Sequence, residues 1–485
     1  PMTPFLKPAA TITTQHKAGH MEERRRKNAH RIAAAAAFGL CGTFLLYGAN
    51  ESLTRDYARS LKREEGRRGK KAQSRRRAEA GDEDFPARRP PNILFLLLDQ
   101  WRYDWDGQSD HVAPNGPVPL NLPFLSSAAA NGTRFTKAYV PSPLCAPSRA
   151  CLASGKEYDF AGMPVNHADE YPTNQTTFYK LLRDEGGYHV MSCGKDDLHK
   201  NDVNFPYYPD PDFNDRRLMR PFEERYPEEW GHGDDDEWSW EPPSAATGGG
   251  TDDGGRELNP LNSRFGTIDL GFSDAIRSAG KTKVVREIEP FEPYRTLLEE
   301  TQVKLDDGSD VKAFDAYNDC WSGTETGVVG PRCDSSTFTS DIYPDDYVKE
   351  SAISLLDRKP EGKPWFLQVN FPGPHPPILS SASMAESVKG RPWPKPYDSP
   401  REEDVCPQDT DGRSGPRNGG RCNYGAQIEN LDKLMDAIVG RIPKGEKDDT
   451  LICISGDHGE MLGDHGQGGK TKPWTASVSV PLVCF

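Results

Sequence analysis

Strand-length apolar runs recur between residues 92 and 455, and they constrain the fold of this chain more than any other feature. The first run, at Asn92–Leu98, reads NILFLLL, and such continuity is typical of a parallel strand buried on both faces. Similar runs follow at Phe135–Val140, Tyr188–Ser192, Trp365–Phe371 and Leu451–Ser455. Helical patterns lie between them, at Thr176–Asp184, Asp346–Asp357 and Ile428–Ile442. The alternation predicts an α/β fold, a mostly parallel sheet flanked by helices.

Polar side chains follow each of these runs. They are Asp99 and Gln100 after the first, Cys145, Ser148 and Arg149 after the second, Lys195 and His199 after the third, His375 after the fourth, and Asp457, His458, Asp464, His465 and Lys470 after the last. Ligands of open α/β sheets bind at the carboxyl ends of the strands. The sequence therefore predicts one site that combines oxygen ligands, imidazole, several cations and a thiol.

Four of these side chains form a candidate metal site. Asp99, Gln100, Asp457 and His458 offer hard oxygen donors and one nitrogen, a set that favours Ca²⁺, then Mg²⁺ or Mn²⁺, over Zn²⁺ held by thiolates. Each pair alone has a simpler interpretation, as a cap at a strand end or as a tight turn. Their coincidence at the ends of apolar strands favours the metal.

Cys145 opens a segment that reads CAPSRACLASGK. Pro147 and Ser148 suit the start of a helix, so Cys145 would lie at a helix N-terminus, where backbone dipoles stabilise an anion. Arg149 follows one turn later and can bind the same group with its forked guanidinium. The simpler alternative is an ordinary helix cap with a small buried cysteine.

This segment resembles the C-x-P-S-R signature of type I sulfatases. The matching residues are Cys145, Pro147, Ser148, Arg149 and Gly155, and further similar segments lie at Pro91–Gln100, Phe371–Pro377 and Ile454–Leu482. The resemblance covers residues 91–485 and is poor between Asn201 and Pro344. It implies an alkaline phosphatase-like fold and a cysteine that a formylglycine-generating enzyme oxidises to formylglycine.

The resemblance also implies roles for individual residues. Asp99, Gln100, Asp457 and His458 would hold the metal together with the modified Cys145, with Gln100 in place of the more common Asp. Arg149 would hold the hydrated formylglycine, and Lys195, His375 and Lys470 would contact the sulfate. In the mechanism that it implies, one hydroxyl of the hydrate would attack sulfur. We expect His375 to protonate the leaving alcohol, and His199 to take the proton of the second hydroxyl as sulfate is released and the aldehyde is restored. His199 lies four residues after Lys195, where the family usually has two.

The first 90 residues differ in charge from the rest. They carry 20 Lys and Arg against 10 Asp and Glu, a net charge of +10, which leaves −24 for residues 91–485. The acidic body argues against binding nucleic acid. Ile32–Ala49 is an uncharged run of 18 residues, at the lower limit for crossing a bilayer, with basic residues on both sides.

We therefore predict a basic cytoplasmic tail at 1–31, a transmembrane signal anchor at 32–49, a charged stem at 50–90 and a catalytic domain at 91–485. This arrangement predicts a single-pass type II membrane protein of the Golgi, the endoplasmic reticulum or another secretory compartment. A cleaved signal peptide is the alternative.

The stem and the body have further features. Asn50, Asn131 and Asn174 begin N-x-S/T sequons, which a lumenal protein can use for glycans. Cys320 with Cys333 and Cys406 with Cys422 could close polar loops as disulfides, or all could be reduced thiols. Residues 201–344 read as a variable, insertion-rich region. The resemblance implies that a smaller C-terminal domain, absent here, follows the final VPLVCF.

Three functional hypotheses remain open. The first is a sulfuric ester hydrolase that releases sulfate from a sulfated carbohydrate, since a lumenal protein lies among glycans. The second is a phosphodiester or phosphonate monoester hydrolase of the same superfamily. The third is an inactive membrane protein that binds sulfated glycans. Rates with an aryl sulfate and an aryl phosphodiester would separate the first two.

Overall fold

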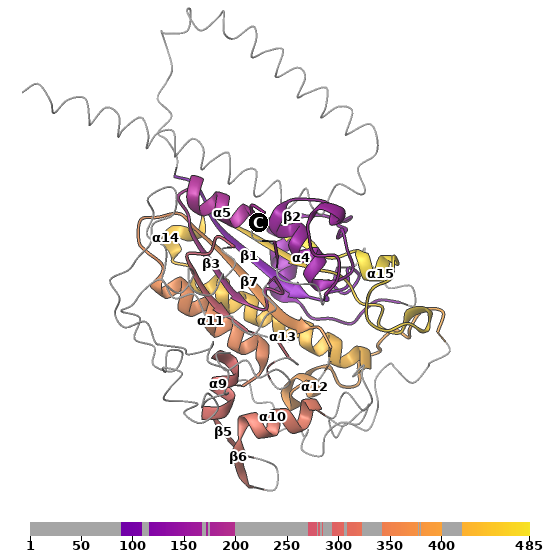
Figure 1. Ribbon diagram of the computed structural model, residues 1–485. Helices are drawn as coiled ribbons and strands as arrows, with labels where there is room; N and C mark the ends of the chain where they lie inside the picture. The colour runs from indigo at the N-terminus through magenta and orange to yellow at the C-terminus, as the bar shows by residue number, and fades with distance from the viewer. Residues whose placement is uncertain are drawn as a thin grey trace, which may run out of the picture.

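The computed structural model describes residues 89–108, 116–166, 171–198 without 173 and 174, 270–304 without 279, 282, 283 and 285–292, 308–322, 342–399 without 377 and 379, and 420–485. It contains a seven-stranded sheet in the order β2-β9-β8-β1-β7-β3-β4 (Figure 1). The five parallel strands are β1 (Asn92–Asp99), β3 (His189–Gly194), β4 (Asp274–Arg277), β7 (Trp365–Pro374) and β8 (Thr450–Gly456). The antiparallel edge is formed by β9 (Leu482–Cys484) and β2 (Thr133–Arg134). The predicted α/β class with a mostly parallel sheet is confirmed.

β1 lies at the centre of the sheet and supplies side chains to both of its faces. Leu94, Leu96 and Leu98 belong to one hydrophobic core. Ile93, Phe95 and Leu97 belong to the other core, on the opposite face. Because side chains alternate along a strand, a strand buried on both faces must be apolar throughout, which explains the unbroken run.

Helices cover both faces (Figure 1). One core contains residues of α3 (Pro123–Asn131), α11 (Pro344–Arg358), α12 (Ala382–Val388) and α13 (Gly420–Arg441). The other contains residues of α4 (Cys145–Ser154) and of α5 (Phe178–Lys180), which continues as a π-helical turn at Leu181–Glu185. Further elements are α9 (Pro293–Glu300), α10 (Ala313–Ser322), α14 (Lys444–Lys447), α15 (Thr475–Val478) and the antiparallel pair β5 (Gln302–Lys304) and β6 (Asp310–Lys312).

One predicted strand is wrong. Phe135–Val140 forms no regular strand: β2 ends at Arg134, and the run makes only an isolated bridge from Tyr139 to Ser479. Of its apolar side chains only Ala138 and Val140 are buried, with the exposed Thr136 and Lys137 before them. The segment is pinned instead by hydrogen bonds from Val140 N to Val478 O (2.8 Å) and from Val480 N to Ala138 O (3.1 Å).

The predictions for the N-terminal segments and several cysteines lie outside the described residues. Within the described part of the chain, no helix is both long and apolar enough to cross a bilayer, and the span predicted at 32–49 is not included. Cys422 is disulfide-bonded, whereas Cys406 and Cys333 are not described. A disulfide that the sequence did not suggest joins Cys453 of β8 to Cys484, its register partner on β9, with Cα atoms 4.2 Å apart.

Candidate active site

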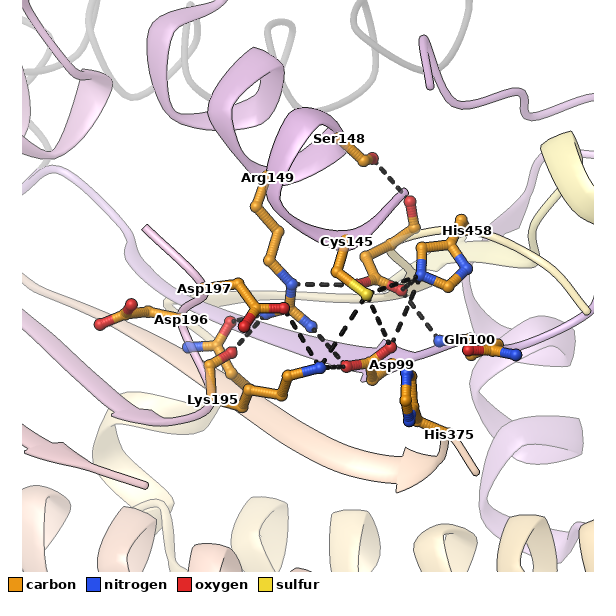
Figure 2. Close-up of polar contacts among 12 residues, drawn as sticks. Asp99, Gln100, Cys145, Ser148, Arg149, Lys195, Asp196, Asp197, His375 and His458 are labelled. Carbon is orange, nitrogen blue, oxygen red and sulfur yellow. Dashed lines mark hydrogen bonds and ion pairs between the residues drawn. The ribbon is translucent and has the colours of Figure 1, made fainter. Parts of the chain in front are cut away.

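Buried polar side chains from four parts of the fold meet at the carboxyl edge of the sheet (Figure 2). Asp99 ends β1, Asp457 and His458 follow β8, and Cys145 begins α4. All four are at most 3% exposed. Lys195 reaches them from the segment after β3. Because β1, β3 and β8 are parallel in one sheet, their ends must lie at the same edge, as the sequence predicted.

The thiol of Cys145 is surrounded by charged and polar groups. Its Sγ lies 2.6 Å from Lys470 Nζ, 3.2 Å from His458 Nε2 and 3.7 Å from Asp99 Oδ1. Lys195 Nζ is 3.9 Å away on another side. Burial, and next the negative charge of Asp99, raises the pKa of this thiol to about 12. The unmodified side chain is therefore a protonated thiol at neutral pH, which is a poor nucleophile.

Helix α4 is fastened to the rest of the site by the two residues that follow its proline. Ser148 Oγ donates to the backbone oxygen of Asp457 (2.6 Å), and Arg149 Nε donates to Asp457 Oδ2 (2.9 Å). Arg149 Nη1 also donates to the backbone oxygen of Lys195 (2.6 Å) and to Asn370 Oδ1 (3.0 Å). The remaining nitrogen, Nη2, lies 3.7 Å from Asp99 Oδ2 and is buried without a hydrogen-bond partner in the described structure. It is a free donor close to residue 145.

The residues predicted as metal ligands fit a hard divalent cation. One ligand atom from each of Asp99, Cys145, Asp457 and His458 lies within 4.8 Å of the others. Gln100 N donates to Asp457 Oδ1 (2.9 Å), which places Gln100 beside this group, and its side-chain Oε1 is buried without a hydrogen-bond partner in the described part of the chain. Buried acceptors without donors are rare in proteins and often mark the place of an ion or water.

The two lysines balance the carboxylates. Lys195 Nζ contacts Asp99 Oδ2 and lies 3.1 Å from Asp197 Oδ2. Burial lowers the pKa of Lys195, but Asp197 and Asp99 outweigh it, so the pKa stays well above its usual value. For Asp99 burial has the opposite sign and raises the pKa, because it disfavours the carboxylate. Lys195 and other nearby cations outweigh burial and hold the pKa of Asp99 well below its usual value. Cations of this kind attract and orient an anionic substrate.

Both imidazoles of the site are neutral at pH 7 in the absence of a ligand. Burial lowers the pKa of His458 to about 4. Burial, and next the positive charge of Lys470, holds the pKa of His375 well below its usual value. His375 Nδ1 lies 2.5 Å from the backbone oxygen of Pro376, which can only accept a hydrogen bond, so Nδ1 carries the hydrogen and Nε2 has a free lone pair.

The structure brings together nearly all of the predicted site residues and adds others. One hydrogen-bonded network contains Asp99, Gln100, Cys145, Arg149, Lys195, Asp457, His458 and Lys470. Figure 2 shows His375 beside Asp99. His199 lies outside the described residues. Sequence reasoning missed Asn166, whose Oδ1 accepts from Ala146 N (3.1 Å) and whose Nδ2 lies 3.9 Å from Cys145 Sγ. It also missed Asp197, Asn370 and Glu460.

Two polar residues after β8 do not join the site. Asp464 forms ion pairs with Arg102 (2.7 Å) and Arg421. His465 is partly exposed, 3.2 Å from Asp398. A position after a strand is thus a useful signal for only part of this segment, because Asp464 and His465 bind partners outside the site whereas Lys470 contacts Cys145.

Comparisons with known proteins identify similar proteins. A family model described as Sulfatase matches residues 91–252 and 271–485. An arylsulfatase of Clostridium perfringens is 22% identical over 408 residues, covering 81% of this chain and 68% of that protein. A choline-sulfatase of Rhizobium meliloti is 24% identical over 403 residues, covering 81% of this chain and 62% of that protein. Among solved structures, a phosphonate monoester hydrolase of Agrobacterium radiobacter is similar with a TM-score of 0.47 and 18% identity, over 81% of this chain and 68% of that one. The chain thus spans 62–68% of the length of these proteins.

Proposed function

Because this chain belongs to the sulfatase family, we propose that it hydrolyses sulfate monoesters at the site around residue 145, with that residue in its formylglycine form. The observation that carries the proposal is the position of Cys145 Sγ, between Lys470 Nζ (2.6 Å), His458 Nε2 (3.2 Å) and Asp99 Oδ1 (3.7 Å). An oxygen nucleophile at this point has cations beside it for the sulfate and carboxylates beside it for a divalent metal.

The two groups that the family uses would supply the chemistry that the side chains alone lack. A hydrated formylglycine offers a hydroxyl nucleophile and a second hydroxyl for product release, which neither a thiol nor a serine can do. A divalent cation, for which we propose Ca²⁺, with Mg²⁺ or Mn²⁺ as alternatives, supplies Lewis-acid stabilisation. Asp99, Asp457, His458, Gln100 and residue 145 would hold it.

The cationic side chains hold the reacting groups in place. Arg149 is rigid because three of its hydrogen bonds go to Asp457, Lys195 O and Asn370, and its free Nη2 points to where residue 145 and Asp99 meet. It therefore orients a hydroxyl on residue 145. The ammonium groups of Lys195 and Lys470 both lie near Sγ, Lys195 in contact with Asp99 and Lys470 in contact with His458. They bind the negative oxygens of a sulfate. These donors are in position before the substrate binds, which is the arrangement that stabilises developing charge most effectively.

His375 is the proton donor of the proposal. Its Nδ1 is engaged by Pro376 O, so only Nε2 can exchange a proton with the substrate. Burial and the positive charge of Lys470 lower the pKa of His375 and so disfavour the imidazolium. A bound sulfate ester brings a negative charge that partly cancels that of Lys470, which favours protonation of Nε2 and transfer to the leaving alcohol. We propose His199 as the base that takes the proton of the second hydroxyl and so restores the aldehyde.

We propose a sulfated carbohydrate as the substrate class and a formylglycine-generating enzyme as the partner that modifies Cys145. Support for the carbohydrate comes from the predicted type II anchor at 32–49, which would place the body in a Golgi or other secretory lumen among glycans. The disulfide between Cys453 and Cys484 fits an oxidising compartment. Asn131, whose sequon is exposed, is available there for a glycan. N-glycosidase treatment of the purified chain, with a mass shift that is smaller by one glycan in Asn131→Gln, tests this address.

The decisive experiment is a mass spectrum of the peptide that carries residue 145. The chain is produced in a cell that makes the formylglycine-generating enzyme, and we expect the sulfur to be replaced by a carbonyl oxygen. An unmodified cysteine would contradict the proposal. The same preparation is then tested on an aryl sulfate, choline sulfate, glucosamine 6-sulfate and an aryl phosphodiester. Faster phosphodiester turnover would favour the phosphodiester or phosphonate hydrolase, and binding of sulfated glycans without turnover would favour the inactive binding protein.

A further inference from the structure

The side-chain amide of Gln100 is held at one end only. Its Nε2 donates to Glu460 Oε2, and both side chains are at most 2% exposed. Its Oε1 is buried without a hydrogen-bond partner in the described part of the chain. The backbone of the same residue is fixed by Gln100 N to Asp457 Oδ1 (2.9 Å) and by Tyr424 Oη to Gln100 O (2.6 Å). Only rotation of the amide could exchange its two ends.

Glu460 is fixed by the loop that carries Lys470. Its Oε1 accepts hydrogen bonds from Leu462 N (3.0 Å) and Gly469 N (2.6 Å). A carboxylate is an acceptor only, so its second oxygen, Oε2, requires a donor from Gln100. The amide can meet that requirement only with Nε2 toward Glu460, which leaves the acceptor Oε1 at the other end.

We propose that Glu460 is a positioning residue that selects the orientation of the Gln100 amide, so that Oε1 rather than Nε2 is presented to the divalent cation. The proposal rests on the metal site of the proposed function and deepens it. Glu460 itself is not among the grouped ligand atoms of the metal site. It acts through Gln100, in the way that outer hydrogen-bond partners orient metal ligands in other proteins.

The pairing also explains why a glutamine works at position 100. A carboxylate there would face the carboxylate of Glu460, and two buried acceptors with no proton between them repel each other. The amide supplies a donor to one side and an acceptor to the other without added charge. Gln100 and Glu460 are separated by 360 positions in sequence, so only the fold shows that they form a unit.

Three variants test this unit. In Glu460→Gln, Oε1 of the new amide still accepts from Leu462 N and Gly469 N, but its Nε2 now faces Gln100. The Gln100 amide must then turn its Oε1 toward position 460 and its Nε2 toward the cation. Gln100→Met removes the amide with little change of shape. The exchange Gln100→Glu with Glu460→Gln keeps one donor facing one acceptor and directs a carboxylate oxygen to the cation.

The measurement is the Ca²⁺ affinity of the full chain by isothermal titration calorimetry, with unfolding temperature as a second readout. We expect Glu460→Gln and Gln100→Met each to weaken Ca²⁺ binding by about 10- to 100-fold. The two together should be no weaker than either alone, because Glu460 acts through the amide. The exchange variant should bind within about threefold of the original chain.

Glu429→Gln is the matched control. Glu429 is an equally buried carboxylate that binds Asn121 N (2.7 Å) and Arg391, away from the site network. The Ca²⁺ affinity of the Glu429→Gln variant should equal that of the original chain. Additive losses for Glu460→Gln and Gln100→Met, or unchanged affinity in Glu460→Gln, would overturn the inference and leave the proposed function intact. Absence of Ca²⁺, Mg²⁺ and Mn²⁺ binding by the original chain would overturn both.

Discussion

Two clusters of buried charge follow β1 and β8, and they differ in whether their hydrogen-bonding groups are all used. The first, which we call the reactive cluster, contains Asp99, Arg149, Lys195, Asp457 and Lys470. The second, the structural cluster, contains Arg102, Asp104, Asp464 and Arg421, each at most 4% exposed. Each cluster takes residues from the segments that follow the same two strands. Position in the fold therefore does not distinguish them.

The structural cluster is complete. Arg102 binds both oxygens of Asp104 (2.5 and 2.9 Å) and one oxygen of Asp464 (2.7 Å), and Arg421 binds the other. In the described structure it leaves no buried side-chain nitrogen or oxygen without a partner, whereas the reactive cluster and its neighbour Gln100 leave Arg149 Nη2 and Gln100 Oε1. Unused donors and acceptors, rather than buried charge as such, indicate where a ligand belongs.

The largest difference should come from removing the nucleophile position. Cys145→Ala should lower hydrolysis of an aryl sulfate by at least about 10⁴-fold, because no other group here can replace the modified residue. Cys151→Ala, in the same helix and equally buried, is the control and should retain turnover. Rates are measured at saturating substrate on protein checked by circular dichroism. Retained turnover in Cys145→Ala would contradict the assignment.

The structural cluster should respond in stability. Asp464→Asn leaves Arg102 and Arg421 as buried charges without their shared partner, which should cost about 3–5 kcal/mol in the free energy of unfolding. The kcat of the molecules that remain folded should stay within about threefold. Urea unfolding gives the first quantity and active-site-normalised kinetics the second. A stability change below about 1 kcal/mol would remove the distinction between the two clusters.

Acid should destabilise the folded chain through His458, which lies beside Asp99 and Asp457 of the reactive cluster. The pKa of His458 is about 4 in the folded chain and about 6.5 when unfolded, because burial disfavours the imidazolium. The unfolded chain therefore binds the proton first, so stability is full above pH 6.5 and falls by up to about 3 kcal/mol as the pH drops toward 4. Urea unfolding with a chelator present measures this, and His458→Gln should flatten that part of the profile. The arginines of the structural cluster keep their charge, since burial lowers the pKa of Arg421 only to about 10.

The smallest expected effect comes from replacing an arginine by lysine, which keeps the positive charge but removes the forked shape of the guanidinium. Arg149→Lys keeps the positive charge but loses the fork that binds Asp457, Lys195 O and Asn370 together, so kcat should fall by about 100-fold. Arg421→Lys makes the same change in the structural cluster and should lower the unfolding temperature with kcat unchanged. Equal loss of kcat in both variants would mean that the clusters act as one unit.

The central part of the fold was predictable because its physical cause is local. Strands β1, β7 and β8 are buried on both faces, and each therefore appears in the sequence as a mostly apolar run, unbroken over Ile93–Leu98 in β1 and interrupted in β7 by the buried Gln368 and Asn370. The run at 135–140 failed because its burial is intermittent and its partners at 478–480 pair with it only at isolated hydrogen bonds. β9 was missed because three residues are too few to show a pattern.

The site was predictable where a residue follows a strand or helix start, and not where it acts through a distant partner. Asp99, Cys145 and Asp457 are fixed by the elements that they end or begin. Glu460 and Asn166 gain their roles from contacts with Gln100 and Cys145, which only the folded chain brings near. The structure shows such pairs directly, while a single sequence contains no signal for them.

The burial of α4 imposes an order of events on the life of this protein. All residues from Cys145 to Ala153 are buried, so the modifying enzyme of the proposed function would have access to residue 145 only before the polypeptide has folded. If residue 145 is converted as we propose, a molecule that folds before the modification would keep an unmodified, buried thiol and would be inactive. Growth at lower temperature, or slower synthesis, should therefore raise the fraction of molecules that carry formylglycine at position 145.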